Sequence, residues 1–291
     1  MKKSPLPLVR PDERDAQLNA LRHEKMAESA HAYVGGSTIK FYEWLESNQR
    51  ISLPEGPPVW ICGDCHLGNL GPIASVDGSL DIAIRDLDQT VIGNPTHDLI
   101  RLGLSLAMAA RSSDLPGVTT AYILERMIEG YEAAFTAADS CDSAQMPETV
   151  KVAMRRAAGR SWKHLADERI EGVDPTIPLG KRFWPLAPAE DQAIRDLFEQ
   201  ENVRKLITML RTRDDDDPIE VVDAAYWRKG CSSLGRLRYA VLVAVGDGKA
   251  VRHCLVDIKE AAAAVAPRDT KATMPRDNAE RVVEGACHLS P

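Results

Sequence analysis

The chain has 291 residues, of which 44% are hydrophobic and 27% charged, values typical of a globular protein with one large domain or two lobes. The net charge of −7 argues against a general nucleic-acid-binding protein. No segment approaches the run of about 18 apolar residues that a membrane span needs. The N-terminus lacks the apolar core of a secretory signal. We therefore expect a cytoplasmic protein with its six cysteines reduced, acting on neither nucleic acid nor membrane.

The first third of the chain predicts helices followed by short strands. Apolar residues recur with helical spacing over 12–33, and after a Gly-Gly break a shorter helix is expected to begin at Ser37 or Thr38. Two apolar runs, 57–62 and 79–84, are typical of buried strands. The glycine- and proline-containing stretch between these runs predicts turns.

The rest of the chain changes from helices to strands. Helices are predicted over 96–111, 118–135, 148–170 and 188–211. Three β-type runs follow at 224–230, 236–245 and 250–259, the last two joined by the hairpin turn GDGK. The expected fold class is α+β, with a mostly helical lobe at 1–215 and a β-rich lobe at 216–291.

Residues 62–66 read Cys-Gly-Asp-Cys-His, a motif that several kinds of chemistry share. C-x-x-C-H is the signature of covalent haem attachment, which takes place outside the cytoplasm. Cys62 and Cys65 have the spacing of a zinc or thiol-redox pair, although no second ligand pair for zinc is found. Asp64 lies five residues before Asn69, the interval of a kinase catalytic loop. A structural loop with packed cysteines is a further interpretation.

The kinase interpretation makes more demands, and the sequence meets most of them. A carboxylate has to orient the acceptor hydroxyl and take its proton, and Asp64 is the candidate. The candidate metal ligands are Asn69, Asp86 and Asp88, because hard Mg²⁺ prefers oxygen ligands. The interval from Asn69 to Asp86 suits a hairpin that joins two loops.

A polar turn and a lysine in the last third of the chain supply the remaining residues that the kinase interpretation requires. The turn contains Gly230, Ser232, Ser233 and Gly235, whose N–H groups and hydroxyls can face phosphate oxygens. Lys259 ends the third β-type run, where a kinase places the lysine that binds the α- and β-phosphates. The candidate partners of this lysine are Glu260, Glu280 and Glu284.

Together these segments resemble the bacterial domain-of-unknown-function family numbered 2252, itself similar to the protein-kinase-like and aminoglycoside-phosphotransferase-like fold. The resemblance is carried by KMAESAHAYVGG, CGDCHLGNLG, IRDLDQTVIGNPTHDLIRLGLSLAMAAR, KGCSSLGRLRYAVLV and VDIKEA. It implies a two-lobed kinase-like fold with permuted order, since the catalytic loops precede the glycine turn and Lys259. It also implies that Asp98 and Arg101 brace the catalytic loop.

The chain departs from the family pattern at three places. Arg85 stands where an asparagine usually precedes the two aspartates, and Leu87 replaces an aromatic residue between them. His97 stands where a tryptophan usually precedes Asp98. The turn GCSSLG lacks the family's middle glycine, which restricts close approach of its backbone to phosphate. The family also continues with further helices, so we expect a shortened or divergent member.

The function predicted from the sequence is ATP- and Mg²⁺-dependent phosphotransfer to an unidentified small-molecule or protein acceptor. Asp64 and His66 are assigned to catalysis, although His66 is also suited to hydrogen bonding within the loop. The second prediction is a catalytically silent pseudokinase that binds a nucleotide or a partner. The third is a zinc or thiol protein that uses Cys62 and Cys65. The sequence predicts neither the acceptor nor the oligomeric state.

Overall fold

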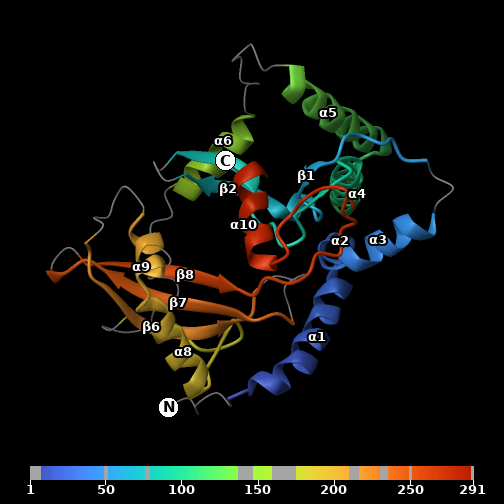
Figure 1. The fold of residues 1–291 in the computed structure, drawn as a ribbon. Coiled ribbons are helices and arrows are strands. Elements are labelled where there is room, and N and C mark those ends of the chain that lie inside the picture. The colour runs from blue at the N-terminus through green and yellow to red at the C-terminus, as the bar shows by residue number, and fades with distance from the viewer. Residues whose placement is uncertain are drawn as a thin grey trace. The chain divides into compact units, whose positions relative to one another are not determined.

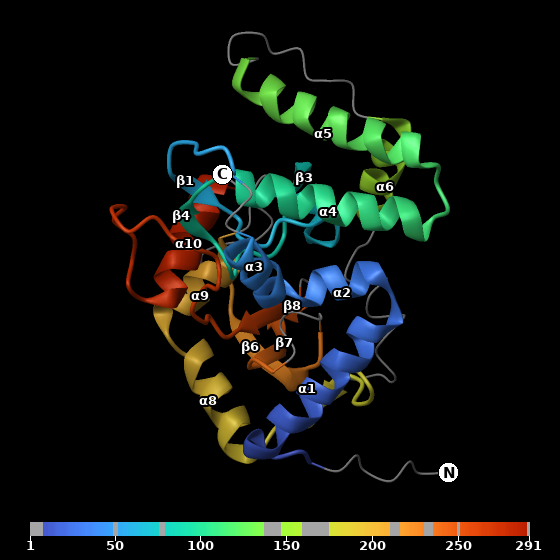
Figure 2. The same cartoon turned by 90° about the vertical axis from the view of Figure 1, so that its right-hand side faces the viewer.

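The computed structural model describes residues 8–48, 52–75, 79–136, 147–158, 175–209, 216–229, 235–248 and 251–289. Its fold is mixed α+β, with helices and antiparallel strand pairs (Figures 1 and 2). The chain divides into two compact units, each assembled from three separated segments. Unit 1 comprises Met1–Ala20, Ala74–Asp81 and Lys151–Glu260, and unit 2 comprises Leu21–Ile73, Ile82–Val150 and Ala261–Pro291.

Unit 1 is built on a four-stranded antiparallel sheet with the strand order β5–β6–β7–β8. The strands are β5 (Phe183–Trp184), β6 (Ile219–Trp227), β7 (Arg238–Val245) and β8 (Arg252–Lys259). Successive side chains of a strand point to opposite faces, so Val241 and Val243 lie on one face while Ala240 and Leu242 lie on the other. Both faces of β7 are buried, which makes it the central strand of this unit.

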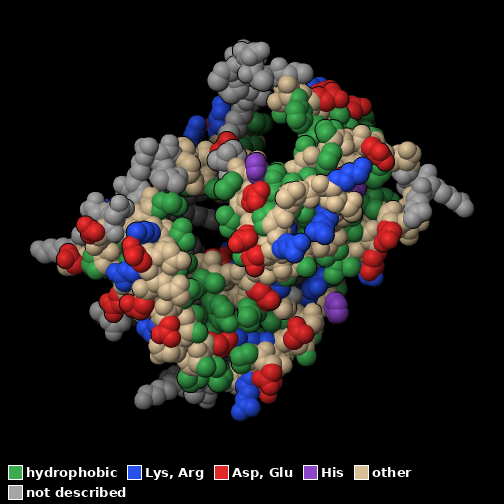
Figure 3. Space-filling model, in the orientation of Figure 1, with side chains coloured by type: hydrophobic (Ala, Val, Ile, Leu, Met, Phe, Trp, Pro, Cys, Tyr) green, Lys and Arg blue, Asp and Glu red, His purple; other side chains and the backbone are tan. Residues whose placement is uncertain are grey.

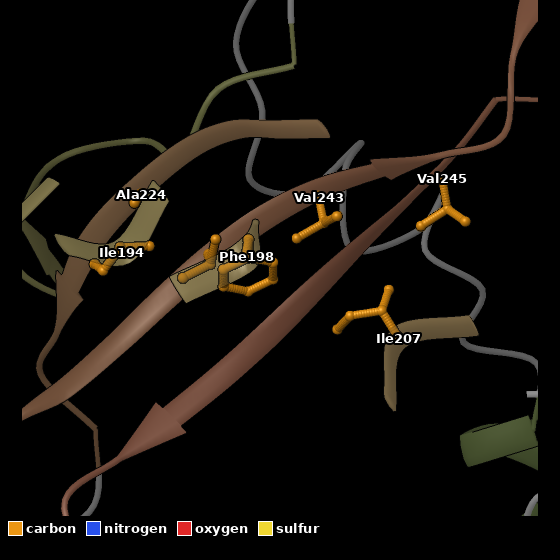
Figure 4. Packing of buried hydrophobic residues seen from close by; sticks show 7 residues of the cluster. Ile194, Phe198, Ile207, Ala224, Val243 and Val245 are labelled. Carbon is orange, nitrogen blue, oxygen red and sulfur yellow. The ribbon is translucent and has the colours of Figure 1, made fainter. Parts of the chain in front are cut away.

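Helices α8 (Pro188–Phe198) and α9 (Glu201–Thr208) cover one face of this sheet. Ile194 and Phe198 of α8, together with Ile207 of α9, pack against the valines of β7, as Figure 4 shows. Fully burying side chains of this size stabilises a fold by about 1.5–3 kcal/mol each. This hydrophobic cluster is therefore a main source of stability in unit 1.

The first part of helix α1 (Pro11–Glu28) is fastened to the same unit by a buried ion pair. Arg14 is only 2% exposed and donates to the two carboxylate oxygens of Glu190 at 2.6 and 2.8 Å. Tyr239 donates its hydroxyl to Glu190 Oε1 at 3.0 Å. The guanidinium of Arg14 also lies 4.5 Å from the ring centre of Tyr226. These contacts join α1 to α8, β6 and β7.

Unit 2 combines helices with two short β-ribbons. Strand β1 (Val59–Ile61) pairs with β4 (Val91–Gly93), and β2 (Leu70–Ala74) pairs with β3 (Leu80–Ile84), although residues 74–81 at the tip of the second ribbon are grouped with unit 1. The helical elements are α2 (Ala30–Gly36), α3 (Thr38–Ser47), the 3₁₀ turn η1 (Leu67–Asn69), α4 (Thr96–Ser112), α5 (Gly117–Thr136) and α10 (Asn278–Leu289). Helices α4 and α5 lie side by side in both ribbon views.

Most predicted elements are confirmed, and two differences near the N-terminus have local causes. The helix predicted over 12–33 is interrupted at Ser29, whose hydroxyl accepts a hydrogen bond from the N–H of Ala32 at 3.0 Å and caps a new helix. Residues 70–74, predicted as turn, form strand β2. Pro72 is tolerated there because a two-stranded ribbon consists only of edge strands.

Three more differences concern the later part of the chain. The helix predicted over 188–211 is two helices, separated at Glu199 and Gln200. Strand β5 was not predicted, because two residues are too few to show a period-2 pattern. The helix predicted over 148–170 is described as α6 (Glu148–Ala158), and its remainder lies outside the described residues. The division into lobes at 1–215 and 216–291 stays a prediction, and residue 215 lies outside the described residues.

The mixed α+β class is confirmed, and the permuted kinase-like arrangement stays a prediction. Among the described helices, none has the length and apolarity needed to cross a membrane. Figure 3 shows acidic and basic side chains dispersed among each other over the face in view.

Candidate functional site

The motif-bearing loop of unit 2 begins where β1 ends, at a conformationally constrained glycine. Gly63 has a φ of +72°, in the left-handed region that favours glycine. A Cβ atom at this position would lie 2.2 Å from the carbonyl oxygen of Gln89. The Gly63 carbonyl accepts a hydrogen bond from the hydroxyl of Tyr42 at 2.7 Å. The contact with Gln89 and the hydrogen bond from Tyr42 therefore restrict the backbone next to Asp64.

Asp64 is a buried carboxylate that forms an ion pair with an arginine. The side chain of Arg101, on α4, is 1% exposed and donates from Nε and Nη2 to Asp64 Oδ1 at 2.9 and 2.7 Å. Arg101 Nη2 also donates to the carbonyl of Val34 at 2.6 Å, and its guanidinium lies 5.1 Å from the ring centre of Phe41. Because both nitrogens use Oδ1, the second oxygen of Asp64 is left for other partners. Nε2 of His66 lies 3.8 Å from this second oxygen.

Asp98, one helical turn before Arg101, holds the backbone of the same loop. Its two carboxylate oxygens accept hydrogen bonds from the N–H groups of Cys62 and Gly63 at 2.7 and 2.9 Å. Burial raises the pKa of Asp98 to about 6, although these N–H groups act in the opposite direction. Arg101 and Asp98 therefore both contact the loop directly, as the family resemblance implied.

The raised pKa of Asp98 predicts a particular dependence of stability on pH. A carboxyl whose pKa is higher in the folded state than its ordinary 3.8 binds its proton more tightly when folded, so its contribution to stability is lost as pH rises through about 6. Between pH 7 and pH 5 the free energy of unfolding should rise by about 1 kcal/mol in the wild type relative to Asp98→Asn. Urea unfolding of both proteins at pH 5, 6 and 7 measures this difference. A difference that is independent of pH would contradict the prediction.

Asn69 connects this loop to the loop of the two aspartates. Its side chain is buried, and Nδ2 donates to the backbone carbonyl of Asp86 at 2.7 Å and of Asp64 at 3.4 Å. The backbone N–H of Arg85 donates to the Asn69 carbonyl at 2.9 Å. These bonds close the base of the β2–β3 ribbon and confirm that a hairpin joins Asn69 to Asp86. The amide oxygen of Asn69 is the end of the side chain suited to a metal ligand.

Arg281 of α10 holds the aspartate loop from the other side. It is 5% exposed, and its guanidinium donates to the carbonyls of Asp88 at 3.1 Å, of Ala262 at 2.9 Å, and of Thr90. The N–H of Asp88 in turn donates to Asp86 Oδ1 at 3.3 Å. The loop that carries both aspartates therefore has a fixed backbone. The role of Arg281 was not predicted from the sequence, because no local pattern shows that an arginine in an amphipathic helix is buried.

His66 lies in a tight space between two glycines. A Cβ atom would lie 3.2 Å from His66 Cε1 and Nδ1 if added to Gly68, and 3.4 Å from Cε1 if added to Gly35. Burial lowers the pKa of His66, so this imidazole is uncharged at neutral pH. Its Nδ1 is buried and has no hydrogen-bond partner. The catalytic assignment of His66 stays a prediction.

The two cysteines of the motif are buried, and both are free thiols. A hydrogen bond with Cys65 and burial raise the pKa of the Cys62 thiol, so this group is protonated at neutral pH and a poor nucleophile. Cys62 Sγ lies 3.6 Å from Asn69 Nδ2 and 3.7 Å from the carbonyl of Asp86. In the part of the chain that the structure describes, no group of three or more His, Cys, Asp or Glu residues is placed to hold a metal ion.

The residues predicted to contact phosphate belong to unit 1, where Gly235 and Lys259 are described. Gly235 has a φ of +99°, and Lys259 pairs with Arg238, so both lie at the same end of the sheet. Glu260 uses its carboxylate to accept the N–H of Leu237 at 2.8 Å. Gly230, Ser232 and Ser233 lie outside the described residues. Glu280 and Glu284 are exposed residues of α10 in unit 2.

Each unit therefore brings together its own subset of the predicted residues. In unit 2, hydrogen bonds connect Asp64, Asn69, Asp86 and Asp88 into one polar cluster, with His66 beside it. Most of these bonds involve backbone groups, so they fix the two loops that carry the three aspartates and Asn69 close to one another. Tyr42 and Arg281 support the cluster and carry no motif signal that would have identified them.

The comparison with known proteins assigns the chain to a family. Residues 14–291 match the family described as "Uncharacterized protein conserved in bacteria (DUF2252)", and the chain belongs to it. No curated protein and no solved structure matches the chain.

Proposed function

We propose that the protein transfers the γ-phosphoryl group of ATP to a hydroxyl group of an unidentified acceptor, in a fold related to that of protein kinases. The observation that carries this proposal is the bond from Asn69 Nδ2 to the carbonyl of Asp86, 2.7 Å long. It brings an Asp-x-x-x-x-Asn loop and an Asp-x-Asp loop together, and phosphotransferases use this pair to orient an acceptor and hold Mg²⁺.

Asp64 is proposed to orient the acceptor hydroxyl and take its proton. Arg101 holds one oxygen of this carboxylate, which fixes its position and leaves the second oxygen for the hydroxyl. The acceptor oxygen bonds to the γ-phosphorus while the bond to the bridging oxygen of ADP breaks, and the hydroxyl proton goes to Asp64. Asp98 and Arg281 fix the two loops and do not contact the reacting atoms in this proposal.

The donor set fits Mg²⁺. Asn69 and Asp86 are proposed ligands, with Asp88 as a further partner, and all three supply oxygen atoms. Mg²⁺ usually takes one or two carboxylates and completes its shell with water and phosphate oxygens, so a larger cluster of carboxylates is not required. When bound, the ion would neutralise the charge of the phosphates.

Nucleotide binding tests this function. ATP with Mg²⁺ should raise the melting temperature of the wild type, and a ligand at 100 times its Kd stabilises a fold by about 2.7 kcal/mol. Asp86→Ala should weaken ATP binding by about tenfold or more in Mg²⁺, and much less in EDTA. Asp81→Ala, an exposed aspartate on β3, is the matched control and should bind as the wild type does.

Turnover separates the proposed function from the silent alternative. Asp64→Asn should bind ATP while losing about 10²–10⁴-fold in the rate of phosphate transfer or of ATP hydrolysis. If wild-type protein binds ATP but turns over no faster than Asp64→Asn, a nucleotide-binding pseudokinase is the better description. If ATP causes no thermal shift and Asp86→Ala changes nothing, both versions fail.

A further inference from the structure

One end of the unit 1 sheet concentrates positive charge, in contrast to the acidic chain as a whole. At this end lie the start of β5, the end of β6, the start of β7 and the end of β8. The basic residues there are Lys181, Arg182, Arg228, Lys229, Arg236, Arg238 and Lys259. The acidic residues there are Asp257, Glu260 and Glu190, the last paired with Arg14, and Asp15 of α1 lies beside Gly235.

Part of this charge is neutralised within the sheet. Arg238 donates to both carboxylate oxygens of Asp257, and Lys229 Nζ lies 3.6 Å from the same carboxylate. Both cations also lie over the ring of Trp227, at 4.2 Å for Lys229 and 5.4 Å for Arg238. Both cations thus have a carboxylate partner, which they share.

Arg228 is different, because it is half-buried without a counter-charge. Its guanidinium lies over the ring of Trp184, 4.5 Å from the ring centre, and the atom Nε is buried with no hydrogen-bond partner. No carboxylate in the described residues pairs with it, nor with the adjacent Lys181 and Arg182. Burial lowers the pKa of Arg228, which is the effect expected when no nearby anion offsets the loss of water.

An uncompensated, partly buried cation is costly, and native proteins normally pair such groups. The contact with the ring of Trp184 also restricts the orientation of the guanidinium. Flat, oriented guanidinium groups are well suited to phosphate, which accepts two parallel hydrogen bonds. Arg182 lies next to it, because the N–H of Arg228 donates to the carbonyl of Arg182 at 2.8 Å.

We infer that Arg228, assisted by Lys181 and Arg182, binds the phosphate chain of a ligand at the Lys259 end of this sheet. The inference rests on the proposed function in so far as the phosphate chain is that of ATP. A free linear polyphosphate has the same chemistry and is the other source of such a chain. Arg228 would then be a phosphate-binding side chain at the same end of the sheet as Lys259, outside the glycine turn that the sequence indicated.

Binding of inorganic tripolyphosphate to the full chain, measured by calorimetry in EDTA, tests this inference. Arg228→Gln removes the charge and keeps a planar end group, and it should weaken binding by about tenfold or more. Arg252→Gln is the matched control, because Arg252 is exposed at the opposite end of β8, and it should bind as the wild type does. If Arg228→Gln does not fold, the exposed pair Lys181→Gln and Arg182→Gln should still weaken binding by about threefold.

The outcomes separate this inference from the proposed function. Equal affinity of wild type, Arg228→Gln and the Lys181/Arg182 variant for tripolyphosphate would overturn the inference, as would no binding by the wild type. If the wild type nevertheless turns over ATP, the proposed function stands and only the inference about Arg228 fails. If Arg228→Gln weakens tripolyphosphate binding but no ATP is turned over, the phosphate site stands and the phosphotransfer proposal fails. A larger loss of affinity for ATP than for tripolyphosphate would identify the nucleotide as the source of the chain.

Discussion

Replacing Arg101 by methionine is expected to lower the free energy of unfolding by about 3–5 kcal/mol. The substitution leaves the carboxylate of Asp64 buried without its cation, since Arg101 donates two hydrogen bonds to this carboxylate. It also leaves the carbonyl of Val34 without its donor and removes the contact with Phe41. Methionine has a similar length and fills the space, so the loss reports mainly on charge and hydrogen bonding. Urea unfolding followed by circular dichroism measures it.

A double-mutant cycle shows how much of this loss belongs to the ion pair. In the Arg101→Met background, Asp64→Asn removes the stranded charge and should restore about 1–3 kcal/mol. In the wild-type background the same change should destabilise, because it leaves Arg101 without its anion. Additive effects of the two substitutions would contradict the view that these residues act as one buried pair. A cost below about 1 kcal/mol for Arg101→Met would contradict it as well.

The second large effect is expected at Gly63. Alanine there combines an unfavourable φ of +72° with a Cβ placed 2.2 Å from the carbonyl oxygen of Gln89 and 2.9 Å from Cβ of Ala266. The Gln89 segment cannot move freely, because the Gln89 side chain accepts the N–H of Val265 at 2.6 Å. We expect Gly63→Ala to cost more than about 3 kcal/mol, combining backbone strain with overpacking. Soluble yield and urea unfolding of the purified variant measure this cost.

Gly130 is the matched control for this substitution. It lies inside helix α5, and a Cβ there would meet nothing within 4 Å. Gly130→Ala should therefore stabilise the protein by about 0.5–1 kcal/mol, the gain in helix propensity. If Gly63→Ala is as stable as the wild type, the loop has another conformation than the one described, and the positions of Asp64 and Asn69 would have to be revised.

Both predictions bear on function, because the same contacts that stabilise the loop also place its carboxylate. A variant that folds but displaces Asp64 should keep nucleotide binding and lose turnover, since the bond from Asn69 to the Asp86 carbonyl and the bond from Arg281 to the Asp88 carbonyl remain. Stability and activity can thus be separated by measuring both on each variant.

Local patterns were enough to predict much of the fold. The helical patterns over 96–111 and 118–135 correspond to α4 and α5, and the three β-type runs of unit 1 correspond to β6, β7 and β8. The motif spacing also predicted the hairpin between Asn69 and Asp86, because a short chain segment has few ways to return on itself. The prediction was wrong where a single residue ends one helix and caps the next, as Ser29 does. It also missed β5, an element too short to show a period.

The sequence by itself determined the α+β class, the family, and the identity of the polar residues on the two loops of unit 2, because these depend on local periodicity and on residues close together along the chain. The family resemblance implied that Asp98 and Arg101 brace the first loop, and only the tertiary structure decided which atoms they bind and that Tyr42 and Arg281 also support the loops. Arg101, Asp98 and Arg281 contact the loops from helices distant in sequence, and their burial follows from packing that no local pattern records. That Arg228 is half-buried with no carboxylate partner among the described residues is likewise visible only in three dimensions, because it depends on the residues that pack around it.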